Sequence, residues 1–138
     1  MKPAEIRGSE VTALFAAACE ELNSFSRELI SRDVLKNVRS STYIGVPLSG
    51  WKLEKHIEAT LPSSDAWDAV WSLELSEDNG KWIVEASASV SHREIYFGLD
   101  EVTVRGLEEL QMALKEAVVK ISLSGMPGGE FYETAIKM

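Results

Sequence analysis

Two glutamates on a predicted hairpin are the strongest candidates for chemistry in this sequence. Residues 71–90 read as two strands joined by Asn79-Gly80, a dipeptide that favours a two-residue turn. On that turn Glu74 lies directly opposite Glu85, and like charges placed this way cost roughly 0.2–1 kcal/mol. Paired carboxylates act as general acid and base where their surroundings separate their pKa values, and they also recruit lysine or arginine from outside.

The opposition of Glu74 and Glu85 has three interpretations. Both carboxylates can be exposed and screened by solvent, or the true register can differ from the predicted one. This first interpretation is favoured, because charged side chains on a strand are usually exposed to solvent and have no further role. The pair can instead bind a cation from a neighbouring strand or from a partner. Catalysis is the third interpretation, and no other motif in the sequence supports it.

Other residue types that carry chemistry are sparse. The two histidines, His56 and His92, are predicted on opposite faces of a sheet, and no closely spaced set of ligands has zinc spacing. Cys19 lies in an alanine-rich segment, where a buried and inert thiol is expected. The glycines of residues 125–129 follow a helix instead of opening one, so they form no phosphate cradle. We therefore expect no catalytic residue, no metal and no cofactor.

Four tryptophans fall within a short stretch of the chain: Trp51, Trp67, Trp71 and Trp82. Clustered aromatic residues can line a ligand pocket, but in a small domain they more often supply core area. A Trp-lined pocket between sheet and helices would belong to a small-molecule binding protein or a small enzyme. That is the alternative to the function predicted below.

The hairpin that positions the glutamates has an apolar face and a polar face, since side chains alternate along a strand. On the apolar face, large residues of the first strand meet smaller ones of the second: Trp71 with Ala88, Leu73 with Ala86 and Leu75 with Val84. The opposite face pairs Ser72 with Ser87 beside the two glutamates. This polar face is the surface on which we expect a partner.

An N-terminal helix is predicted from Ser9 to about Arg32, with one apolar stripe. Its first half, Val11 to Cys19, contains no charged residue. Three alanines lie off the stripe, and two explanations stay open for them. They reflect helix propensity alone, or they mark a second contact within the domain or with another copy: Ala13, Ala16 and Ala17.

A β-meander is predicted after this helix. Residues 51–61 fit both a strand and a helix, and we choose the strand because their apolar residues alternate. The complete set of predicted strands is 51–61, 66–77, 81–91 and 93–99, the last resuming at 102–104 past an irregularity at Gly98, with short extended segments at Tyr43-Ile44 and 131–138.

A second helix is predicted at about residues 107–123. Opposite its core stripe it carries a weaker apolar strip, formed by Met112, Val119 and Leu123. A contiguous exposed apolar strip is a candidate interface. Either the segment 131–138 or a second subunit can cover it.

These elements predict an α+β fold of two layers. An antiparallel meander of about four to five strands is packed on one face by an N-terminal and a C-terminal helix. The 138 residues are expected to form a single domain, 1–138. The net charge of −8 argues against binding to nucleic acid or to an anionic membrane, because both attract positive charge.

The predicted function follows from charge, size and the lack of catalytic motifs. We expect a small acidic cytoplasmic protein, because the one cysteine excludes an internal disulfide and indicates a reducing compartment. It would work without catalysis, by contact with a protein partner that is basic, and it can form a homodimer. An inhibitor or immunity-type protein is one concrete version. The candidate contact residues are Ser72, Glu74, Glu85 and Ser87 on the sheet and Met112 and Val119 on the second helix.

Overall fold

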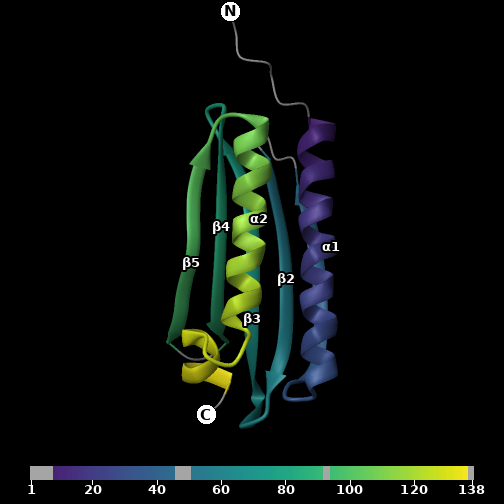
Figure 1. The fold of residues 1–138 in the computed structure, drawn as a ribbon, viewed down its shortest axis with the longest axis vertical. Helices are drawn as coiled ribbons and strands as arrows, with labels where there is room; N and C mark the ends of the chain where they lie inside the picture. Colours follow the sequence, from purple (N-terminus) through teal and green to yellow (C-terminus); the bar gives the residue numbers. More distant parts are fainter. Residues whose placement is uncertain (1–7, 46–50, 92–93, 137–138) are drawn as a thin grey trace, which may run out of the picture.

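The predicted α+β fold is confirmed by a computed structural model that describes residues 8–45, 51–91 and 94–136 (Figure 1). Five strands form one antiparallel sheet in the order β1-β2-β3-β4-β5, so each strand pairs with its neighbours in sequence. The elements in chain order are α1 (Gly8–Arg32), β1 (Lys36–Gly45), β2 (Lys52–Leu61), β3 (Ser64–Asp78), β4 (Lys81–Val90), β5 (Ile95–Val104), α2 (Leu107–Ser124) and the short π-helix η1 (Tyr132–Ile136).

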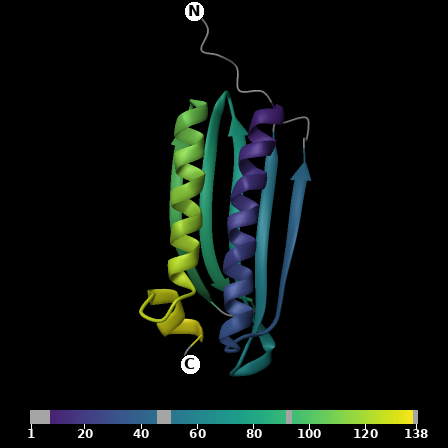
Figure 2. The ribbon, with the colours of Figure 1, turned by 45° about the vertical axis from the view of Figure 1, so that its right-hand side comes forward.

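Both long helices cover the same face of the sheet (Figure 2). α1 packs over β1 and β2, α2 packs over β3, β4 and β5, and the two helices contact each other. No helix of the described residues covers the other face of the sheet, and we call it the open face. In the described part of the chain, neither helix is apolar enough over its length to span a membrane.

The central hairpin has the predicted register. Asn79 and Gly80 have φ angles of 52° and 79°, as a turn with two left-handed residues requires. Glu74 pairs with Glu85 and Trp71 with Ala88. Residues 51–61 are also extended as predicted, because alternate residues of β2 are buried against the helices.

Trp71 contacts both helices and the C-terminal segment at one end of the core. Its ring makes edge contacts with Phe25 of α1 and with Phe131, at centroid distances of 5.3 and 5.5 Å. Its Nε1 donates a hydrogen bond to Ser124 Oγ at 3.0 Å, which satisfies the one polar group of a buried indole. The hairpin, both helices and the C-terminal segment therefore meet at this side chain.

The prediction of a strand-like segment at 131–138 is wrong for its described part. Residues 132–136 form η1, and Phe131, Ala135 and Ile136 are buried. These positions are four and five residues apart, which is a helical spacing and not the alternation of a strand. At the other end of the sheet, the short segment expected around Tyr43 is part of a longer edge strand, β1, that begins at Lys36.

The three alanines outside the stripe of α1 are exposed. Ala17 borders a small groove between the helices, opposite Gln111 and Leu114 of α2. Both explanations for the three alanines stay predictions. Ala13 and Ala16 face solvent in the described structure.

Candidate functional site

Four glutamates lie in one row across the open face of the sheet. Glu54 pairs with Glu74, Glu74 with Glu85, and Glu85 with Glu101. One carboxylate therefore comes from each of β2, β3, β4 and β5, and we call the set the carboxylate row. The sequence predicted only the central pair of the row, Glu74 opposite Glu85, because only the hairpin at Asn79 carries a two-residue turn signal.

Lys52 compensates one end of the carboxylate row. Lys52 Nζ lies 3.4 Å from Glu54 Oε1, and His56 Nε2 lies 3.8 Å from Glu54 Oε2. The other three glutamates of the row form no ion pair with any residue that the structure describes. Unbalanced negative charge is thus concentrated over β3, β4 and β5.

The carboxyl group of Glu74 has a raised pKa. Burial raises its pKa above the ordinary value of 4.5, and the charge of Glu54 and a hydrogen bond with that residue raise it further. Lys52 opposes the rise, and Glu85 adds to it. The deprotonated row is therefore a site of like-charge repulsion that either a proton or an outside cation would relieve.

A serine–histidine contact lies in the next row of the open face. Ser72 pairs with His56 on one side and with Ser87 on the other, and His56 Nδ1 lies 2.9 Å from Ser72 Oγ. Such a contact can activate a nucleophile, but acyl transfer also needs free N–H donors for an oxyanion. β2 and β3 are paired on both sides, so their ladder uses these donors.

A β-bulge distorts the sheet at the β5 end of the carboxylate row. Ala86 pairs with Asp100 but Ser87 pairs with Gly98, so Leu99 is an extra residue without a partner. This is the irregularity that the sequence predicted at Gly98. A bulge bends its strand and re-aims the neighbouring side chains.

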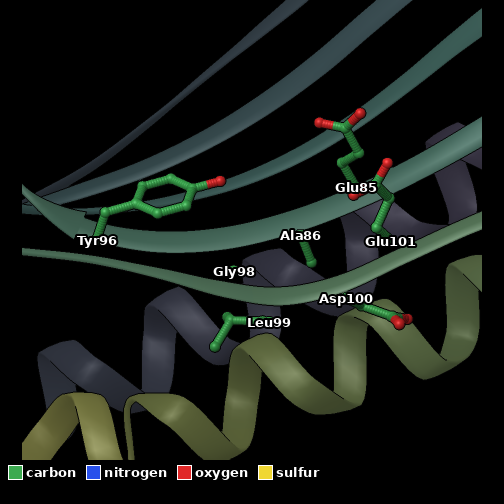
Figure 3. A pocket seen from close by; sticks show the side chains of 7 residues that line it. All are labelled: Glu85, Ala86, Tyr96, Gly98, Leu99, Asp100 and Glu101. Carbon is green, nitrogen blue, oxygen red and sulfur yellow. The ribbon is translucent and has the colours of Figure 1, made fainter.

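A pocket of about 370 Å³ opens beside this bulge, and we call it the acidic pocket (Figure 3). Glu85 and Glu101 stand next to each other on the open face, and the ring of Tyr96 lies on the same side of the sheet. Asp100 points away from them, toward α2, where its Oδ1 accepts a hydrogen bond from Lys120 Nζ at 3.0 Å. Its Oδ2 is buried and has no hydrogen-bond partner among the described residues.

A second pocket, of about 290 Å³, lies on the helix-covered side of β5, and we call it the apolar pocket. Its walls are mainly apolar, with Lys120 and Glu130 also contributing. The apolar residues that line it are Phe97, Leu99, Leu123 and Phe131. Sequence analysis did not predict either pocket, because both depend on where the bulge and the C-terminal segment lie in space.

The outer strip of α2 is exposed, as the sequence suggested. Met112, Val119 and Leu123 are 63, 55 and 59% exposed. The described residues 131–136 do not cover the strip, since Phe131 packs instead against Trp71 and Phe97. A role of the strip in partner binding stays a prediction.

The four tryptophans differ in burial. Trp71 and Trp82 belong to the core, and Trp51 and Trp67 are partly buried and pack against it. They occupy the positions expected of core residues. The Trp-lined pocket of the alternative hypothesis stays a prediction.

Cys19 is buried, as expected. Burial raises the pKa of its thiol, which the positive charge of Lys55 opposes and the negative charge of Glu20 reinforces. Lys55 was the one exception to the alternation of β2; it is 5% exposed, and its Nζ donates to Thr42 Oγ1 at 3.3 Å.

His92 lies outside the described residues, so its predicted orientation is not covered by the structure. Among the residues that are described, no group of three or more His, Cys, Asp or Glu has an arrangement that could hold a metal ion.

Comparisons of the chain with family models, curated proteins and solved structures find no match. The function is therefore inferred from the geometry and charge of the described residues.

Proposed function

We propose that the protein is a non-enzymatic interaction module that binds a basic protein partner through the open face of its sheet. The observation that carries the proposal is the carboxylate row, in which Glu74, Glu85 and Glu101 form no ion pair within the described structure. Lysine or arginine side chains of a partner would supply the missing counter-charges.

Physical considerations favour a cationic partner over a neutral one. Each pair of opposed glutamates costs roughly 0.2–1 kcal/mol in the free protein, and a cation placed between them removes that repulsion. Hydrogen bonds between charged groups are also stronger than those between neutral groups. The net charge of −8 would in addition steer a basic partner toward the protein at low ionic strength.

An inhibitor that masks a basic partner is the form of this function that charge and size favour most. The open face spans five strands, and no helix in the described part of the chain covers it. It offers a broad acidic surface, and broad charged surfaces suit the covering of a complementary surface on another protein.

The test uses poly-L-lysine as a defined basic probe and fluorescence anisotropy as the measurement. Replacing Glu74, Glu85 and Glu101 together by glutamine should weaken binding about tenfold, or about 1.4 kcal/mol. The matched control replaces three exposed helix glutamates, Glu20, Glu108 and Glu116, by glutamine. It changes the net charge by the same amount and should weaken binding much less.

Equal losses in the two triple variants would contradict the proposal, because net charge alone would then account for binding. Binding by the unmodified protein should also weaken steeply as salt is added, since exposed charges are screened. Poly-L-glutamate serves as the negative control for the probe.

A further inference from the structure

We infer that the partner binds as an extended segment that adds to the free edge of β5, with a basic residue in the acidic pocket and a neighbouring apolar residue in the apolar pocket. This inference rests on the proposed function and specifies the form of the partner. It is carried by the placement of two chemically different pockets beside one edge strand, with the carboxylates of Glu85 and Glu101 on the open face and the apolar pocket on the helix side.

β5 is the last strand of the sheet and pairs only with β4. Its outer edge meets no other strand in the parts of the chain that the structure describes. The backbone N–H and C=O groups on such an edge are a template for one more strand. Strand addition gives affinity through these groups, and pockets beside the strand give specificity.

The acidic pocket has the composition of a site for a cationic side chain. Two carboxylates, of Glu85 and Glu101, lie side by side on the open face, and the ring of Tyr96 lies on the same face farther along β5 (Figure 3). Carboxylates accept hydrogen bonds from lysine or arginine, and the face of an aromatic ring attracts the same cations. The Tyr96 side chain is 70% exposed, so its ring is available to a ligand.

The apolar pocket fits an uncharged side chain. Phe97 and Leu99 reach it from β5, and Leu123 reaches it from α2. Leu123 is 59% exposed in the free protein, so covering it with an apolar side chain would remove apolar surface from water, which favours binding.

The two pockets lie at the same height along the strand. Gly98 and Leu99 border both of them. Successive residues of an added strand point to opposite faces of the sheet, so adjacent ligand residues can enter the two pockets at once. Gly98 has no side chain to obstruct the approach of a second backbone. The partner segment should therefore alternate basic and apolar residues.

Charge distinguishes β5 from the other edge strand. On β1, Arg39 forms ion pairs with Glu58 and Asp68 at 3.1 and 2.7 Å. The guanidinium would repel a basic segment, and the acidic groups near it are already compensated. The uncompensated carboxylates Glu85 and Glu101 lie at the β5 side.

The experiment compares two short capped peptides of equal charge, one of alternating lysine and leucine and one of alternating lysine and serine. We expect the lysine–leucine peptide to bind roughly tenfold more tightly, since only it fills the apolar pocket. L123S should abolish this difference and leave the affinity for the lysine–serine peptide unchanged. I30S is the matched control, because Ile30 of α1 is exposed to a similar extent, at 57%, but does not line the pocket.

Hydrogen exchange locates the bound peptide. Saturation with the lysine–leucine peptide should slow exchange of amides in β5 and leave those in β1 unchanged, because only the edge that gains a strand gains hydrogen bonds. The Glu74, Glu85 and Glu101 triple variant should weaken the binding of both peptides.

The outcomes separate the two proposals. If both peptides bind equally, lose affinity in the glutamate variant and leave β5 exchange unchanged, the open face binds cations and strand addition is wrong. If neither peptide binds, both proposals are wrong. If the free protein has twice its monomer mass by light scattering and its β5 amides are already protected, a second copy occupies the edge, and the inference is overturned.

Discussion

The sheet has two edge strands, β1 and β5, and their side chains differ in kind. Three consecutive polar residues of β1, Ser40, Ser41 and Thr42, are exposed, so this part of the strand is polar on both of its faces. β5 alternates exposed residues on the open face with partly buried apolar residues on the helix side, interrupted at the bulge. The helices cause part of this difference, because α2 packs over β5 while α1 leaves these β1 residues uncovered.

The comparison indicates how one sheet can discourage strand pairing at one edge and permit it at the other. Charged residues and bulges near a free edge discourage unwanted pairing, and β1 has both: Arg39 and a register shift next to Asn37. β5 also has a bulge, but its bulge lies between the acidic and apolar pockets. An edge that lies between two pockets can recognise alternate residues of a segment.

The largest expected difference between the edges is in stability. Phe97→Ala should lower the free energy of unfolding by about 2 kcal/mol, because Phe97 makes an edge contact with Phe131 at 5.7 Å and packs against the core. Tyr43→Ala is the matched change on β1 and should cost about 0.5 kcal/mol or less, since Tyr43 is exposed. Urea unfolding measures both. Equal losses would mean that the two edges are equally integrated with the core.

Sequence patterns were sufficient to predict the parts of the sheet that local chemistry determines. Asn79-Gly80 determines the pairing of β3 with β4, so the apolar face of Trp71 and the opposition of Glu74 and Glu85 could be predicted in register. Alternation was enough to identify β2, although its register with β3 could not be predicted. That register depends on a turn without a comparable signal, and it decides that Glu54 joins the carboxylate row.

The parts of the site that sequence missed depend on contacts between distant segments. Gly98 indicated an irregular strand, but only the pairing of Ala86 with Asp100 shows that Leu99 is the bulged residue. The segment after Gly129 is too short for its period to distinguish a strand from a helix. Its helical form places Phe131 against Trp71 and Phe97, and so completes the apolar pocket.

A smaller difference is expected from the ion pairs that hold each edge. Asp100 is 8% exposed and pairs with Lys120 at 3.0 Å, whereas Arg39 is 45% exposed and its partners Glu58 and Asp68 are 38 and 29% exposed. Lys120→Met should cost about 1–2 kcal/mol, because it leaves a buried carboxylate without its cation. Arg39→Met should cost about 0–1 kcal/mol, as is usual for surface pairs. Thermal or urea unfolding of both variants at one pH makes the comparison, and a larger loss for Arg39→Met would reverse it.

Asp100→Asn provides the control for that experiment. It removes the buried charge together with the ion pair, and the partner that remains, Lys120, is 47% exposed and can be hydrated. The loss of stability should therefore be smaller than for Lys120→Met. If Asp100→Asn were the more damaging change, the ion pair itself would contribute more than the cost of burying its carboxylate, contrary to the argument for β5.

The smallest effect is expected in the centre of the sheet, between the two edges, and it depends on pH. Because the pKa of Glu74 is raised in the folded protein, its protonated form contributes stability below the ordinary value of 4.5, and this contribution is lost as pH rises through the higher folded pKa. Glu74→Gln stays neutral throughout. It should stabilise the protein by roughly 0.2–1 kcal/mol at neutral pH and have no effect in acid. Glu101→Gln, on the exposed edge strand, should change the pH profile less. Urea unfolding across this pH range checks both, and a stabilisation by Glu74→Gln that persisted unchanged in acid would show that repulsion within the carboxylate row is not its cause.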